Sequence, residues 1–133
     1  MIRQLEKQRG ALLFITLIIA IFIFYMSSQT FISGGGTSYL SYVYHFGVFF
    51  ALAFFLLPAS LQGKFDKELF FVVIILCILY GISDELHQYF VPGRNADVHD
   101  VFIDSAGIFA AAVMYISSLV MRRKFSLQSK HFA

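Results

Sequence analysis

The chain has 133 residues, is 59% hydrophobic and only 14% charged, and carries a net charge of +2. Soluble domains contain about 25% charged residues, and a soluble fold of this size could not bury so much apolar surface. The composition therefore excludes an ordinary soluble domain and indicates an integral membrane protein, while the single Cys77 excludes a disulfide framework.

Four apolar stretches are each long enough to cross a bilayer, which takes about 20 helical residues. The first runs from about 11 to 28 and the second from about 38 to 61. The third covers about 65–90 and the fourth about 96–121, with segments that contain Gly, Pro or charged residues between them. We therefore predict an all-α, polytopic membrane protein in which residues 1–133 form one domain, a bundle of four transmembrane helices.

The basic residues predict how this bundle is oriented, because cytoplasmic loops carry an excess of Lys and Arg. Nine of the ten lie at the ends of the spans that share one side: Arg3, Lys7, Arg9, Lys64, Lys67, Arg122, Arg123, Lys124 and Lys130. Only Arg94 lies on the other side. We expect both termini in the cytoplasm and the loop around Arg94 outside, and five Tyr residues at the predicted outer ends agree with this as an interfacial belt.

The stretch "SDELHQYFVPGRNADVHDVFID", residues 83–104, concentrates acidic side chains in an otherwise apolar chain. A carboxylate in a span costs about 2.5–3.5 kcal/mol at the helix centre and less near the ends, so its presence there indicates a function. Glu85 lies near the outer end of the third predicted span, and Asp100 and Asp104 lie near the outer end of the fourth. We predict that these three carboxylates are the catalytic residues of an outward-facing polar site.

Other polar residues reach the same depth from different spans. His45 lies about two turns into the second span, and Arg94 belongs to the outer loop. Asp84, His87 and Gln88 are spaced i, i+3 and i+4, which places them on one helix face. We predict that His45, His87, Gln88 and Arg94 bind the substrate of this site.

Structural interpretations remain open beside the functional ones. In the structural interpretation, Glu85 and Gln88 form hydrogen bonds or ion pairs with Arg94, Asp100 and His45. This network holds the helices together and has no catalytic or binding role.

The loop between the third and fourth spans has its own structural signals. The "VPG" motif at 91–93 predicts a helix end followed by a tight turn. Asn95 or Asp97 is expected to cap the fourth helix. Asp84 and His99 lie near the water boundary, where solvation alone would explain them.

The chain resembles the VanZ-like membrane protein family. The resemblance rests on an apolar helix that ends "SDELHQYFVPGR", followed by "DVFIDSAG" at the start of the next helix, and on "YHFGVFFAL", which carries the His of the family's second helix as His45. At the positions of the family's second-half motif the chain has Glu85, Gln88, Arg94, Asp100, Asp104 and Gly107. It departs from the pattern at Gln29, where the family commonly has Pro.

The resemblance implies a small bundle of about four helices in the bacterial plasma membrane and a role in the cell envelope. The family takes its name from a protein associated with low-level resistance to the lipoglycopeptide teicoplanin. Its partners would be membrane lipids and, beyond them, an envelope precursor or a lipoglycopeptide. The resemblance implies no particular reaction.

Three functions remain in competition. An envelope-modifying enzyme would use Glu85 or an Asp as general acid or base, hold a divalent cation with carboxylates and His, and bind an anionic head group at Arg94. A non-catalytic accessory protein would need the same site without turnover. A proton-coupled transporter ranks third, because transport sites lie near the bilayer midplane, whereas the polar residues of this chain gather in the outer third of the spans. Nucleic acid binding has no support, because membrane topology explains the basic residues.

Overall fold

Four long helices make up the described part of the chain, which comprises residues 8–30, 39–94 and 96–131 of the computed structural model. In chain order they are α2 (Arg9–Ser27), α3 (Tyr39–Leu61), α4 (Lys67–Phe90) and α5 (Val98–His131). These residues contain no strand, and each helix is long and apolar enough to cross a membrane. The prediction of an all-α membrane protein with four spanning helices is confirmed, while the side on which the termini lie stays a prediction.

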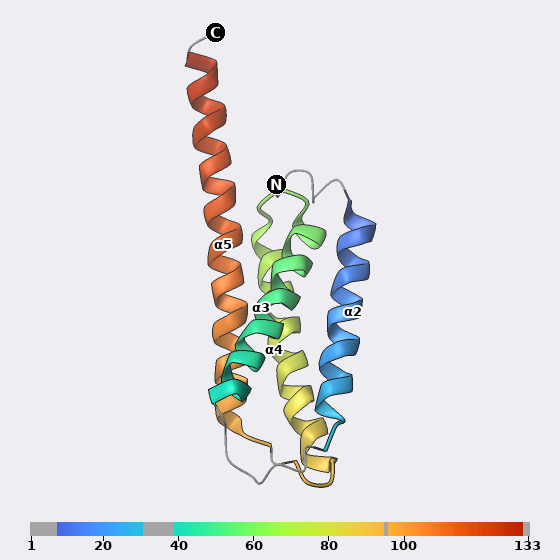
Figure 1. Cartoon of the computed structure of the whole chain (residues 1–133). Coiled ribbons are helices and arrows are strands. Elements are labelled where there is room, and N and C mark those ends of the chain that lie inside the picture. Colours follow the sequence, from blue (N-terminus) through green and yellow to red (C-terminus); the bar gives the residue numbers. More distant parts are fainter. Residues whose placement is uncertain (1–7, 31–38, 95, 132–133) are drawn as a thin grey trace.

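The helices begin and end within two residues of the predicted spans, with one exception. The fourth span was expected to end near 121, but α5 continues to His131. The prediction followed hydropathy, and Arg122, Arg123 and Lys124 end the apolar stretch without ending the helix, because Arg and Lys are good helix formers. At about 1.5 Å per residue, 34 residues extend about 51 Å, which exceeds the hydrocarbon core of about 30 Å. In Figure 1, α5 accordingly projects beyond the other helices.

Consecutive helices run in opposite directions (Figure 1). The end of α2, the start of α3, the end of α4 and the start of α5 therefore lie at one end of the bundle. We call this the outer end, after the orientation predicted from Lys and Arg. The other, inner end holds the start of α2 and the connection between α3 and α4.

The middle of the bundle is an apolar core. Its members include Ile23 of α2, Phe49 and Leu57 of α3, and Ile108 of α5, and all four are fully inaccessible to solvent. Large apolar side chains such as Phe14 point outward and are exposed on the bundle surface. In water this arrangement would be unfavourable, whereas lipid tails are a suitable solvent for it.

A close approach of α3 and α5 depends on Gly107. A Cβ atom at this position would collide with the backbone carbonyl oxygen of Phe46 and would lie 3.0 Å from the backbone nitrogen of Phe50. Only glycine lets the two backbones come this near. The contact aligns His45, the neighbour of Phe46, with Asp104, which lies nearly one turn before Gly107.

The connection between α4 and α5 contains the predicted tight turn. The Arg94 backbone N–H donates to the carbonyl oxygen of Val91 over 3.1 Å, and Gly93 has a φ of +80°. Pro92 followed by a residue with positive φ is the pattern of a type II turn. The turn reverses the chain and returns Arg94 toward the end of α4.

Asp97 caps α5, as one of the two predicted alternatives. Its Oδ1 accepts a hydrogen bond of 2.9 Å from the backbone N–H of His99 and lies 2.9 Å from the ring Nδ1 of the same residue. These two contacts with His99 lower the pKa of the Asp97 carboxyl below its ordinary value. The other candidate, Asn95, lies outside the described residues.

Candidate functional site

Seven buried polar side chains lie together at the outer end of the bundle. We call them the polar cluster, and they are Ser27, His45, Asp84, Glu85, Gln88, Asp100 and Asp104. Every helix contributes at least one of them, because the alternating helix directions bring the outer ends of all four together. Buried polar groups are tolerated only when they are paired, so the contacts within the cluster decide what it can do.

His45 lies between two carboxylates of α5. Its Nδ1 is 3.0 Å from Oδ1 of Asp104, and its Nε2 is 3.6 Å from Oδ2 of Asp100. The imidazole and the Asp104 side chain are 2% and 1% exposed, so water screens their interaction little. Both ring nitrogens therefore face negative groups in a buried environment.

Gln88 connects α4 to the rest of the cluster. Its Nε2 donates to Oδ2 of Asp84 over 2.9 Å and to Oε1 of Glu85 over 3.1 Å. Its Oε1 accepts a hydrogen bond of 2.7 Å from Arg94. On the other side of Asp84, the Ser27 hydroxyl of α2 donates to Oδ1 over 2.6 Å. One amide thus joins the guanidinium at the outer turn to two buried carboxylates.

Glu85 also ties α4 to the segment that precedes α5. Its Oε2 accepts a hydrogen bond of 2.9 Å from the backbone N–H of Asp97. With Oε1 bound to Gln88, both oxygens of Glu85 have donors and the carboxylate is held in one orientation. The adjacent start of α5 is therefore positioned by a side chain from within the cluster.

The carboxylates of α5 are less completely paired. Oδ1 of Asp100 and Oδ2 of Asp104 are buried and have no hydrogen-bond partner among the described residues. The hydroxyl of Tyr44, the residue before His45, is in the same situation. Unpaired buried acceptors are costly, and they mark the part of the cluster where a ligand with donors or positive charge would be stabilised.

The cluster also contains a group of possible metal ligands. His45, Glu85 and Asp104 each offer one ligand atom, and these atoms lie within 4.8 Å of one another. The three residues come from α3, α4 and α5. An imidazole with two carboxylates is a chemically suitable donor set for several divalent cations.

Six of the seven residues predicted for the site meet at the outer end. These are His45, Glu85, Gln88, Arg94, Asp100 and Asp104. His87 takes a different direction: its Nε2 lies 3.0 Å from the hydroxyl of Ser28, and its ring is 4.6 Å from that of Phe24. Its place is the contact between α4 and α2, beside the cluster, and the catalytic and binding roles of all seven stay predictions.

Asp84 and Ser27 also belong to the polar cluster, although neither is among the residues predicted for the site. Solvation was one explanation offered for Asp84, but this side chain is buried and bonded to Ser27 and Gln88. The i, i+4 spacing of Asp84 and Gln88 was the signal that places both on the cluster side of α4. No comparable signal marks Ser27, whose role depends on the packing of α2 against α4. His99, in contrast, has an exposed side chain, in agreement with solvation.

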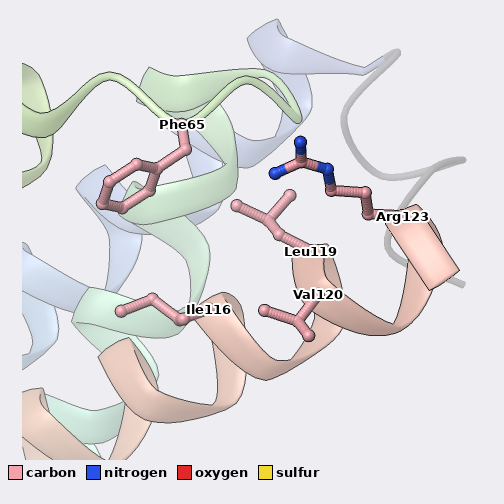
Figure 2. Close-up of a pocket in the computed structure, with 5 residues that line it drawn as sticks. All are labelled: Phe65, Ile116, Leu119, Val120 and Arg123. Atoms are coloured by element: carbon pink, nitrogen blue, oxygen red, sulfur yellow. The ribbon is translucent and has the colours of Figure 1, made fainter.

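An apolar groove lies at the opposite, inner end of the bundle. It has a volume of about 260 Å³ and is lined by Phe65, Ile116, Leu119, Val120 and Arg123 (Figure 2). Its lining has no carboxylate, imidazole or thiol, so it offers no acid–base chemistry. From Asp104 to Arg123 α5 rises about 28 Å, so the groove and the polar cluster are separate features.

Comparison with known proteins identifies the family of the chain. Residues 12–122 match the model of the VanZ/LLP1 family, a range that includes every member of the polar cluster as well as Arg94 and Gly107. Comparisons with curated proteins and with solved structures found no match. Because the match extends over most of the four-helix bundle, the chain belongs to the VanZ/LLP1 family.

Proposed function

We propose that this protein acts on the cell envelope by binding the polar head of a lipid or other envelope amphiphile at the polar cluster, and that it thereby lowers susceptibility to glycopeptides such as teicoplanin. The protein would lie in the bacterial plasma membrane with the cluster toward the outside. Membership of the VanZ/LLP1 family and the four apolar helices support the membrane and envelope setting.

The observation that carries the proposal is a pair of carboxylate oxygens on α5 that have no hydrogen-bond partner in the described part of the chain. Oδ1 of Asp100 and Oδ2 of Asp104 are buried acceptors next to an imidazole. Hydroxyl and amino groups of an envelope head group would supply the donors that these oxygens need. Removing such a buried acceptor's partner costs about 1–3 kcal/mol, so a ligand that supplies it gains comparable affinity.

Arg94 supports recognition of an anionic part of the same head group. Its guanidinium is partly buried at the outer turn and bonded to Gln88, which is bonded in turn to Glu85. Guanidinium groups bind phosphate and carboxylate through parallel hydrogen bonds. A phosphate at Arg94 would place the neighbouring polar atoms of a lipid head group beside the carboxylates of the cluster.

A catalytic version of this function is the second candidate, and the pairing of His45 with Asp104 favours it. A carboxylate that faces one imidazole nitrogen orients the ring and stabilises its protonated form, as in general acid–base catalysis. In that version Glu85, Asp100 or Asp104 moves a proton while the head group is bound. Transport has less support, because the buried residues in the inner half of the described bundle include no carboxylate or imidazole.

The proposal is tested by combining a cellular and a biochemical measurement. In a teicoplanin-sensitive bacterial host, expression of the wild-type protein should raise the minimum inhibitory concentration of teicoplanin, and Asp104→Asn should abolish the increase. Glu68→Gln is the matched control, since Glu68 is an exposed carboxylate at the inner end. Protein purified after incubation with envelope lipid extract should retain a head-group class that Asp104→Asn protein loses.

The same experiment separates binding from catalysis. Retained lipid without new products indicates a binding protein, whereas products that appear with wild-type but not with Glu85→Gln protein indicate an enzyme. If wild-type and Asp104→Asn protein retain the same lipids, give the same products and confer the same susceptibility, the proposed function is wrong.

A further inference from the structure

We infer that the polar cluster holds one divalent transition-metal ion, with His45, Glu85 and Asp104 as its protein ligands. The inference rests on the proposed function in assigning ligand binding to this cluster, and it adds the cation that completes the site. Charge, geometry and a buried oxygen of Asp104 that has no partner among the described residues each support it.

The charge of the cluster is unbalanced without a cation. Four buried carboxylates, those of Asp84, Glu85, Asp100 and Asp104, would carry −4 when ionised. Arg94 contributes +1, and His45 must be neutral to bind a metal, so −4 + 1 leaves −3. Buried charge is costly unless it is paired or binds a metal, and one divalent cation would reduce this excess to −1.

The ligand atoms are close enough to share one ion. The nitrogen of His45 and the oxygens of Glu85 and Asp104 lie within 4.8 Å of one another. Metal–ligand bonds of about 2.0–2.2 Å separate opposite ligands by about 4 Å, so a small inward movement of the side chains would complete the coordination. The three ligands come from three different helices, and binding would therefore cross-link α3, α4 and α5.

Two further features point to a ligand at this place. Oδ2 of Asp104 has no hydrogen-bond partner among the described residues, although the side chain is only 1% exposed. Glu85, in contrast, is held by Gln88 and by the backbone N–H of Asp97, as metal-binding carboxylates are oriented by donors around them. A cation at this place would bind the oriented carboxylate of Glu85 and would give Oδ2 of Asp104 the partner that it lacks among the described residues.

The choice of ion follows from the donor set. Imidazole suits Zn²⁺ and other transition metals, and carboxylates suit Mn²⁺. Mn²⁺ and Zn²⁺ are therefore the probes for the experiment.

The alternative to a bound cation is protonation of the cluster. In that case His45 is an imidazolium between Asp100 and Asp104, and further protons on the carboxylates reduce the negative charge.

Metal loading of the purified full chain tests the inference. Protein in detergent micelles is stripped with a chelator, incubated with Mn²⁺ or Zn²⁺ and passed over a desalting column, and bound metal per chain is measured by mass spectrometry. About one ion per chain is expected for wild-type protein. Asp104→Asn and Glu85→Gln should each weaken metal binding by more than about tenfold, because even the loss of a residue that only hydrogen-bonds a metal ligand lowers metal affinity by about 10–100-fold. Glu68→Gln should bind as wild type does.

The outcomes separate metal binding from folding and from head-group binding. Helix content and elution volume of each variant show whether it is folded, and two carboxylate variants from different helices guard against the failure of one. Wild-type protein without bound metal, or folded Asp104→Asn and Glu85→Gln proteins that both bind as wild type does, would overturn the inference. Metal loading needs no lipid, so the two proposals can fail separately. If the protein binds no metal but still binds lipid in an Asp104-dependent way, the metal site is wrong and the proposed function stands. If it binds metal but shows no Asp104-dependent lipid binding, the proposed function is wrong and the metal site stands.

Discussion

His45 on α3 and Asp104 on α5 are 59 residues apart in the chain, yet Nδ1 of the imidazole and Oδ1 of the carboxylate lie 3.0 Å apart. Both side chains are almost completely buried. The pair joins the two helices that make the most extensive contact in the bundle. It therefore links the packing of the outer end to the chemistry of the polar cluster.

Breaking this pair should destabilise the bundle. His45→Ala leaves Asp104 buried without its imidazole, and removal of one partner from a buried pair costs about 3–5 kcal/mol. The double variant His45→Ala/Asp104→Ala should lose less stability than the sum of the two single variants, because the second substitution removes the uncompensated group. Unfolding in detergent micelles measures this coupling, and strictly additive losses would contradict it.

Gly107→Ala should disrupt the contact between α3 and α5. The added methyl group would collide with the backbone of Phe46, and overpacking of this kind costs about 1–3 kcal/mol. Gly47→Ala is the control, because a Cβ atom there has nothing within 4 Å and Ala is the better helix former. The midpoint of thermal unfolding should fall for Gly107→Ala and stay the same or rise for Gly47→Ala. An equal response of the two variants would show that the close approach does not matter.

Ser27→Ala should cost more than an ordinary hydroxyl deletion. It removes the 2.6 Å donor of a buried carboxylate, Asp84, and a charged group left unsatisfied costs at least about 1–3 kcal/mol. Ser105→Ala is the matched control, since the Ser105 hydroxyl donates to the Val101 carbonyl of its own helix. The free energy of unfolding of the two variants compares them directly, and similar losses would argue against a special role for Ser27.

The start of α5 should stay capped to lower pH than an ordinary aspartate would allow. The contacts with His99 lower the pKa of Asp97 below its usual 3.8. A carboxyl with a lowered folded-state pKa contributes stability above its unfolded value and loses it as pH falls through the folded value. Amide hydrogen exchange in the first turn of α5, corrected for the intrinsic pH dependence, should therefore accelerate only below about pH 3.8. Asp97→Ala should remove this pH dependence, and the exposed Asp66, which caps α4, is the comparison within the same chain.

The tight turn after α4 and the cap of α5 were predictable because their signals are local. "VPG" and Asp97 act through backbone conformation and through hydrogen bonds to residues two or three positions away. The positions of Glu85, Asp100 and Asp104 at the outer end were predictable for a different reason. A charge near the end of an apolar span is expensive enough to stand out in the sequence alone.

Sequence alone determined the membrane setting, the four helices and the level at which their polar residues lie, because hydropathy and length specify how a chain meets a bilayer. Only the tertiary structure decided which groups are in contact. The Ser27 hydroxyl donates to Asp84, the His87 ring lies beside the Ser28 hydroxyl, and His45 lies between Asp100 and Asp104. These pairings depend on the rotation of each helix about its axis and on the close approach at Gly107. Hydropathy predicts neither the rotation of a helix nor the distance between two helices, because packing between the helices determines both.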